Sequence, residues 1–289
     1  MRRSFAFELP EKAPVARSHT AVLHLALMLI TRSDYRWIAY GEVSPEKAVR
    51  FVERMMEQYL VHLPSEALAS RRKAGLPVTR LILAPHVEEL PHYKDGVRRP
   101  VVPYLILSTK DLKGMNLYPI KPKKARPWGR RGRGNELRIF PHSRPDRDRG
   151  RGPSLAYTWR GKYVLGLRPR YSGKNADKPF VYTWFLTNWE FERWSVALTQ
   201  AARDGDLRAL RKLFAYLTEY PRFAGVRKDL KALIRAASKA FEPHRRRADG
   251  RRLTFPLPDE LRELEPIRAV PIWNDPPRTL GDVLSEAQG

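Results

Sequence analysis

The segment PHVEELPH, residues 85–92, gathers the side chains best suited to metal chemistry. Two imidazoles and two carboxylates lie within seven residues, those of His86, Glu88, Glu89 and His92, and transition metals accept this donor set. A metal-dependent nuclease that uses His86, Glu89 and His92 is therefore one hypothesis. However, the spacing fits no established helical ligand pattern, and a proline near each end marks the segment as a loop. A surface loop is the simpler interpretation, so we assign no metal ligand here.

No other segment carries a recognisable catalytic motif. The chain lacks a phosphate-binding loop, a dinucleotide-binding glycine motif and a serine nucleophile elbow. It contains no cysteine, which excludes disulfides, cysteine-ligated zinc, iron–sulfur clusters and a cysteine nucleophile. We therefore expect a protein that acts by binding rather than by catalysis, with no cofactor.

Positive charge is the strongest signal in the sequence. Lys and Arg number 55 against 31 Asp and Glu, which gives a formal net charge of +24. Self-repulsion at this charge destabilises a compact protein unless a polyanion is bound, and this favours nucleic acid, DNA or RNA, as the partner. Residues 121–178 hold 18 Lys and Arg but only four Asp and Glu, a net of +14. The charge is therefore concentrated in the centre of the chain.

Phosphate contacts dominate nucleic-acid affinity, because each neutralised phosphate releases a counterion. Glycines interleaved with the basic residues of 121–153 would let this segment enter a groove and become ordered on binding. A basic helix expected to end near residue 242 could add contacts along a groove. The alternative is an amphipathic helix whose basic face is simply exposed to solvent. The predicted contact residues are Lys121, Lys123, Lys124, Arg126, Trp128, Arg130, Arg131, Arg133, Arg160, Lys162, Arg168, Arg170, Lys174, Arg227, Lys228, Lys231 and Arg235.

Aromatic residues lie in and beside the basic segment, among them Trp159, Tyr182 and Trp184. Exposed rings on a basic sheet stack unpaired bases. Alternation along residues 179–187 places Tyr182 and Trp184 on one face of a strand, and one face of that strand must belong to the core. Core packing is the favoured interpretation for any single ring of this group.

Strands and helices are expected in both halves of the chain. Strands are predicted at 35–43, 78–85 and 101–109, the last near a sheet edge because Pro103 cannot donate to a ladder. Ser44 and Pro45 should begin a helix, and Gly161 should turn a hairpin. The pair Thr187 and Glu190 has the spacing of a capping box.

These elements predict an α+β fold, with a mixed or antiparallel sheet, a long basic insertion loop and a mainly helical C-terminal portion. The expected organisation is an α/β portion at 1–120, a flexible Gly/Pro-rich insertion at 121–153, a hairpin, strand and three-helix portion at 154–242, and a proline-rich extended tail at 243–289.

The sequence thus favours a nucleic-acid-binding protein that grips the phosphate backbone through residues 121–178. A basic subunit of a larger ribonucleoprotein or DNA-processing complex is an alternative, and protein subunits would then be partners as well. No apolar run is long enough to span a membrane, so we expect no membrane partner and a cytoplasmic location. The chain fits a prokaryote or one of its mobile elements, such as a plasmid.

Overall fold

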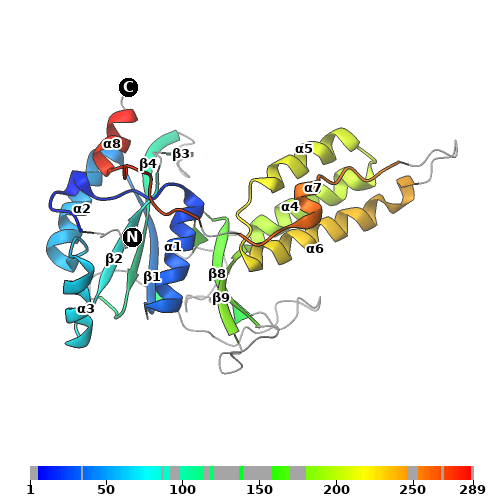
Figure 1. The fold of residues 1–289 in the computed structure, drawn as a ribbon. Helices are drawn as coiled ribbons and strands as arrows, with labels where there is room; N and C mark the ends of the chain where they lie inside the picture. Colours follow the sequence, from blue (N-terminus) through cyan, green and yellow to red (C-terminus); the bar gives the residue numbers. More distant parts are fainter. Residues whose placement is uncertain are drawn as a thin grey trace, which may run out of the picture.

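The fold is α+β, built from helices and two antiparallel sheets (Figure 1). It is seen in a computed structural model. The structure describes residues 6–33, 35–85, 88–91, 98–112, 118–119, 137–138, 158–159, 161–169, 180–245, 253–267 and 270–287.

The first sheet has the strand order β2-β4-β1-β5, and β3 also pairs with β4. Its strands are β1 (Trp37–Val43), β2 (Thr79–Leu83), β3 (Glu88–Pro91), β4 (Arg98–Ser108) and β5 (Tyr118–Pro119). Helices α1 (His19–Arg32) and α2 (Pro45–Tyr59) cover opposite faces of this sheet, and α3 (Ser65–Lys73) follows α2 (Figure 1). Alternate residues therefore enter different cores: Ile82 packs with α1, whereas Leu81 and Leu83 pack with α2.

Strand β4 is central, so the expectation that Pro103 marks an edge was wrong. β4 pairs with β1 along one side, and along the other side with β3 at Arg98–Val101 and with β2 at Tyr104–Ser108. Pro103 lies in the break between these two partners, where its carbonyl accepts a hydrogen bond from the N–H of Ala84 (3.0 Å). The missing proline N–H removes no ladder bond at this break, which explains how a proline fits inside the sheet.

The second sheet is sandwiched between helices from the two halves of the chain. It contains β6 (Leu137–Arg138), β7 (Thr158–Trp159), β8 (Tyr163–Pro169) and β9 (Phe180–Leu186), and all of its pairings are antiparallel. On one face, the buried indole of Trp184 donates to the carbonyl of Leu23 in α1 (2.9 Å). On the other face, Gly225 lies against the Phe185 ring, where a Cβ would collide. This sheet therefore joins the two halves in one core.

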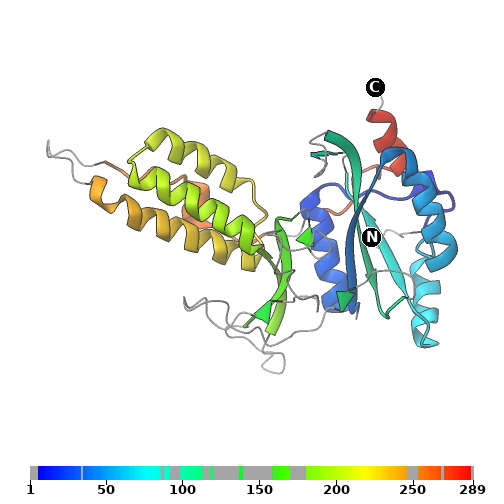
Figure 2. The same cartoon turned by 180° about the vertical axis from the view of Figure 1, so that it is seen from behind.

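Three helices form the helical unit: α4 (Asn188–Arg203), α5 (Leu207–Thr218) and α6 (Ala224–Phe241). They extend side by side in both views (Figures 1 and 2). Asp206 accepts from the N–H of Ala209 (2.9 Å) and so caps the N-terminus of α5. Asp229, buried in α6, accepts from the N–H of Leu186 (2.9 Å) and so ties the helical unit to β9.

The C-terminal strap, residues 253–267 and 270–287, packs along both halves of the molecule. The centroid of its Phe255 ring lies 5.4 Å from that of Phe214 in α5 and 5.5 Å from that of Phe241 in α6. It includes α7 (Asp259–Glu263) and then returns to the first sheet, where α8 (Leu280–Glu286) begins at a complete capping box of Thr279 and Asp282. Two short 3-10 turns, η1 (Pro10–Lys12) and η3 (Glu242–Arg245), complete the described elements.

Candidate nucleic-acid interface

Most of the predicted contact residues lie outside the described residues. These are Lys121, Lys123, Lys124, Arg126, Trp128, Arg130, Arg131, Arg133, Arg160, Arg170 and Lys174. Arg168 is described only through its backbone, which pairs with Val181 in the second sheet. Lys162 is half-buried in the turn before β8, and its carbonyl accepts from the N–H of Thr187 (2.9 Å). The interface can therefore be built from the helical unit, where the remaining four predicted residues lie.

Helix α6 carries an exposed row of cations. Lys228, Lys231, Arg235 and Lys239 are all exposed, and their spacing of three or four residues aligns them along one side of the helix. The opposite side is buried through Leu230, Leu233, Ala237 and Phe241. Amphipathic periodicity thus explains why these cations point away from the core. We call the four residues the α6 row.

Arg227 does not belong to the α6 row. It is half-buried, and its guanidinium donates to the carbonyl of Leu264 in the C-terminal strap (3.1 Å). Arg227 therefore holds the strap against α6, while its predicted neighbours in sequence face outward.

Helix α5 adds a second basic face, which the sequence had not indicated. Arg208, Arg211 and Lys212 are exposed and lie within about one turn of one another. Between their caps, α5 and α6 expose seven cations and no carboxylate, because the only acid within the two helices, Asp229, is buried. Exposed acids lie at the caps, at Asp206, Glu219 and Glu242. Helix α2 differs: it exposes three cations, but Glu46, Glu53 and Glu57 are exposed among them.

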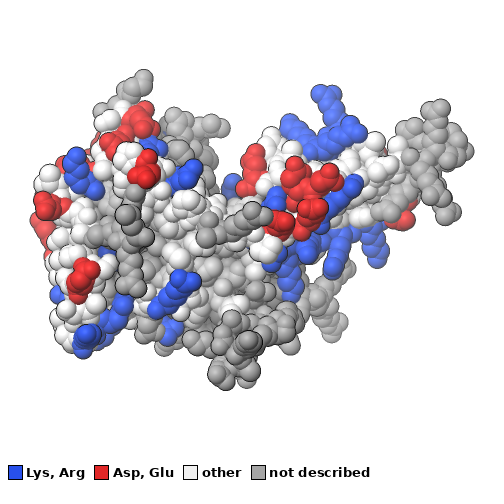
Figure 3. All heavy atoms as spheres, viewed as in Figure 1, with Lys and Arg blue, Asp and Glu red and all other residues white. Residues whose placement is uncertain are grey.

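Figure 3 shows how these charges are arranged on one side of the molecule. Lys and Arg lie along the two long edges of the helical unit, over α5 and over α6. Between the edges lies an acidic strip over α7, made by Asp259, Glu260, Glu263 and Glu265, all of them exposed. The strap therefore makes this side of the helical unit unfavourable for a polyanion.

The exposed face of α4 carries aromatic residues that the sequence reasoning missed. Trp189 is 52% exposed, Val196 is 70% exposed, and Tyr216 of the adjacent α5 is 48% exposed. The guanidinium of Arg193 lies 5.1 Å from the Trp189 ring and 5.3 Å from that of Trp194. The ring of Trp194 is in turn 6.5 Å from that of Tyr216. A helical wheel of 188–203 places Trp189 and Val196 opposite the buried residues of α4, and that signal could have identified them.

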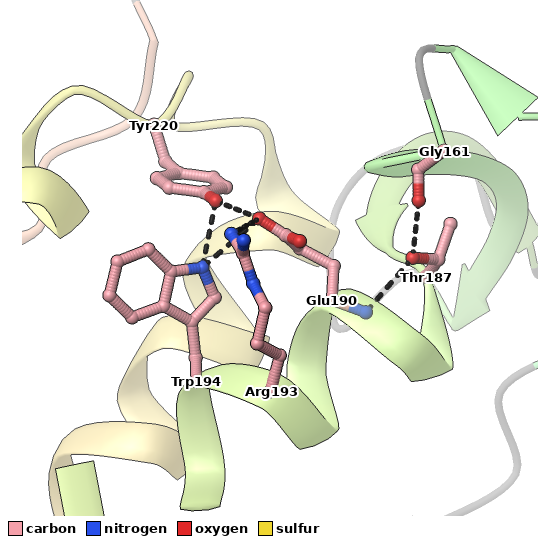
Figure 4. A network of polar contacts seen from close by, with 6 residues as sticks. All are labelled: Gly161, Thr187, Glu190, Arg193, Trp194 and Tyr220. Atoms are coloured by element: carbon pink, nitrogen blue, oxygen red, sulfur yellow. Dashed lines mark hydrogen bonds and ion pairs between the residues drawn. The ribbon is translucent and has the colours of Figure 1, made fainter. Parts of the chain in front are cut away.

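The buried carboxylate of Glu190 binds the polar groups of this aromatic cluster (Figure 4). Glu190 is 0% exposed, and its Oε1 accepts from Arg193 (2.9 Å), from the indole of Trp194 (3.1 Å) and from the hydroxyl of Tyr220. Burial, and then the bond to Glu190, raise the pKa of Tyr220 far above its ordinary value. Tyr220 is thus held as a neutral donor, and Arg193 is pinned between two indoles.

Only half of the predicted capping box at Thr187 forms. Thr187 accepts from the N–H of Glu190 (3.2 Å) and donates to the carbonyl of Gly161 (2.7 Å). The side chain of Glu190 does not return to the cap, because it takes part in the buried network with Tyr220 and Trp194. The spacing located the start of α4 but not the role of its acid.

The aromatic rings of the second sheet are core residues wherever their side chains are described. Trp159 and Trp184 are each 1% exposed, and Tyr163 is buried beside them. Tyr182 is half-buried and packs against the same core. Core packing, the favoured interpretation for these rings, is confirmed for Trp159 and Trp184.

The loop expected at residues 85–92 was wrong for Glu88–Pro91, which form β3 and pair with β4. The metal hypothesis itself falls largely outside the described residues, since His86 and His92 are not among them and only the backbone of Glu89 is described. Within the described part of the chain, no group of His, Asp or Glu has a geometry that could hold a metal ion. None of the helices there combines the length and the apolar character that a membrane span requires.

Comparisons with known proteins give no match: no family model, no curated protein and no solved structure resembles the chain. What the molecule does must therefore be argued from its own surface.

Proposed function

We propose that this chain is a nucleic-acid-binding protein that holds the phosphate backbone of DNA or RNA on its helical unit. The observation that carries the proposal is the charge of α5 and α6, which expose seven cations and no carboxylate. The net charge of +24 for the whole chain supports it, because a polyanion relieves the self-repulsion.

The α6 row has dimensions suited to a nucleic-acid strand. From Lys228 to Lys239 the helix rises about 17 Å, at 1.5 Å per residue. Successive phosphates of one strand of a duplex are about 3.4 Å apart along its axis, so the row spans roughly five of them. Each cation that neutralises a phosphate releases a counterion, which contributes affinity without regard to base sequence.

The most basic part of the sequence adds to this charge. Residues 121–178 hold 18 Lys and Arg against four Asp and Glu. We include the basic residues of 121–178 in the proposed contact on the strength of their charge.

Salt dependence of binding tests the proposal. Oligonucleotides of DNA and of RNA, duplex and single-stranded, are titrated over a range of salt concentrations with the wild type and with a variant in which the α6 row is changed to Gln. We expect a steep linear fall of log K with log salt, and a slope that is smaller by about 3 to 4 in the variant if all four cations neutralise phosphates.

Helix α2 supplies a matched control. Changing Lys47, Arg50 and Arg54 to Gln removes three exposed cations from a face of mixed charge, and the corresponding change of Arg208, Arg211 and Lys212 removes three from α5. The α2 variant should retain the wild-type slope, whereas the α5 variant should lose part of it. A wild-type slope near zero, or equal losses in the α2 and α6 variants, would contradict the proposal.

A further inference from the structure

We propose that the exposed face of α4 binds unpaired nucleotides, whose bases stack on Trp189 and Tyr216. This inference rests on the proposed function and assigns a class of nucleic acid to it. A single strand, or an unpaired stretch of a folded RNA, offers bases that can leave their own stack. A continuous duplex offers only its phosphates to the same surface.

The geometry of Trp189 is that of a prepared stacking surface. Tryptophan buries a large apolar area when it packs in a core, yet Trp189 is 52% exposed. Its ring is not loose, because the guanidinium of Arg193 lies 5.1 Å from its centroid. Arg193 is itself held by a hydrogen bond to the fully buried Glu190. A ring fixed in this way loses little conformational entropy when a base stacks on it.

Tyr216 provides a second ring on the same side of the helical unit. It is 48% exposed and lies 6.5 Å from Trp194, which in turn packs against Arg193. Trp189 and Tyr216 are therefore the two exposed ends of one row of packed groups, with Arg193 and Trp194 between them. Two separated rings can each take a base from one strand.

The charges around this face favour a polyanion over a protein. Figure 2 shows α4 facing the viewer, flanked on its two sides by α5 and α6, the helices that carry the seven exposed cations. α4 itself exposes Glu192 as well as Arg193 and Arg203, which means that the attraction comes chiefly from its neighbours. The core of a protein–protein interface is depleted of charged residues, whereas a strand laid across α4 would meet cations at both edges.

Matched variants at two exposed positions of α4 test the inference. Trp189→Ala removes the ring, Trp189→Phe retains a smaller ring, and Val196→Ala is the control, since Val196 is 70% exposed on the same face. Affinity is measured for a single-stranded oligonucleotide, for a duplex of equal length, and for an abasic strand with the same number of phosphates. Thermal melting of each variant confirms that the fold is retained.

We expect Trp189→Ala to bind the single strand roughly 5- to 100-fold more weakly. Its affinity for the duplex and for the abasic strand should stay within about twofold of wild type, since a neutral ring contributes to neither through phosphate contacts. Trp189→Phe should recover part of the loss, and Val196→Ala should show none. Tyr216→Ala should behave like Trp189→Ala with a smaller loss.

The possible failures can be told apart. If Trp189→Ala leaves single-strand affinity unchanged, or weakens single strand and duplex equally, the stacking site is refuted while the phosphate contact of the α6 row stands. A protein partner for this face would give the first of these results. If neither wild type nor variants bind any of the three oligonucleotides, the proposed function itself fails.

Discussion

Replacing Glu190 with alanine should destabilise the protein by about 3 kcal/mol, the centre of a range from near zero to about 6 kcal/mol. The carboxylate is fully buried and accepts from Tyr220 and from the indole of Trp194, and buried hydrogen bonds to a charged acceptor are each worth about 1.5–3 kcal/mol. The ion pair with Arg193 adds less than about 1 kcal/mol, because the arginine side chain is 49% exposed. The opposing contribution comes from Oε2 of Glu190, a buried atom with no hydrogen-bond partner among the described residues. Removing this atom should stabilise the protein by about 1–3 kcal/mol.

Urea denaturation of Glu190→Ala, Tyr220→Phe and the double variant measures the coupling between the two residues. We expect a coupling energy of about 1–2 kcal/mol, since each substitution removes the same hydrogen bond. The exposed pair Gln200 and Asp204, whose side chains are joined at 3.0 Å at the C-terminal end of α4, is the control and should couple by less than about 0.5 kcal/mol. A stabilised Glu190→Ala protein, or a coupling as weak as the control, would show that burying the carboxylate costs more than its bonds return.

Further outcomes follow from the same contacts. The pKa of Tyr220 is raised in the folded protein, so its contribution to stability should be retained below about pH 10 and should fall above it by up to about 1.4 kcal/mol per pH unit. In the Tyr220→Phe variant, the free energy of unfolding should fall less steeply with alkaline pH, by the slope that one proton contributes. An unchanged slope would contradict the assignment. Gly225→Ala places a Cβ against the Trp184 carbonyl and should cost about 2–4 kcal/mol by urea denaturation, whereas Gly75→Ala, in open space at a positive φ of 69°, should cost only about 1 kcal/mol. Asp229→Ala orphans a buried N–H of β9 and should cost about 1–3 kcal/mol; a change within about 0.5 kcal/mol would show that water satisfies that group.

Local signals in the sequence located the elements well. Pro45 is the first residue of α2, as the sequence predicts, although the Ser44 side chain makes no capping hydrogen bond. Gly161 has the positive φ of 65° that its hairpin turn requires. These features succeed because capping and turn chemistry act over three or four residues. Three residues of the α6 row, Lys228, Lys231 and Arg235, were among the predicted contact residues, and helical periodicity explains their exposure. Lys239 was not predicted, and Arg227, which was, contacts the strap instead.

Long-range packing accounts for what the sequence reasoning missed. Trp184 is covered by α1, more than 150 residues earlier in the chain, and no local pattern indicates which helix covers which face of a strand. Glu190 takes part in a network with Tyr220, thirty residues away, so its capping-box spacing was misleading. Pro103 fits a central strand only because two partners leave a break beside it.

The acidic strip over α7 makes the two sides of the helical unit differ in charge. Four carboxylates are exposed there, and among the described residues 253–267 they lie beside one exposed arginine, Arg262, which is paired with Asp259 (3.3 Å). A polyanion on the strap side would meet these carboxylates between two basic edges, whereas on the α4 side it meets Trp189, Arg193 and Tyr216 between the same edges. Coulomb repulsion over distances shorter than the Debye length, about 8 Å at physiological salt, disfavours the first path. The strap therefore packs on the core through Phe255 and Leu264 and also places carboxylates on one side of the helical unit. In the proposed binding mode, a nucleic acid would be directed to the opposite side, where the exposed rings lie.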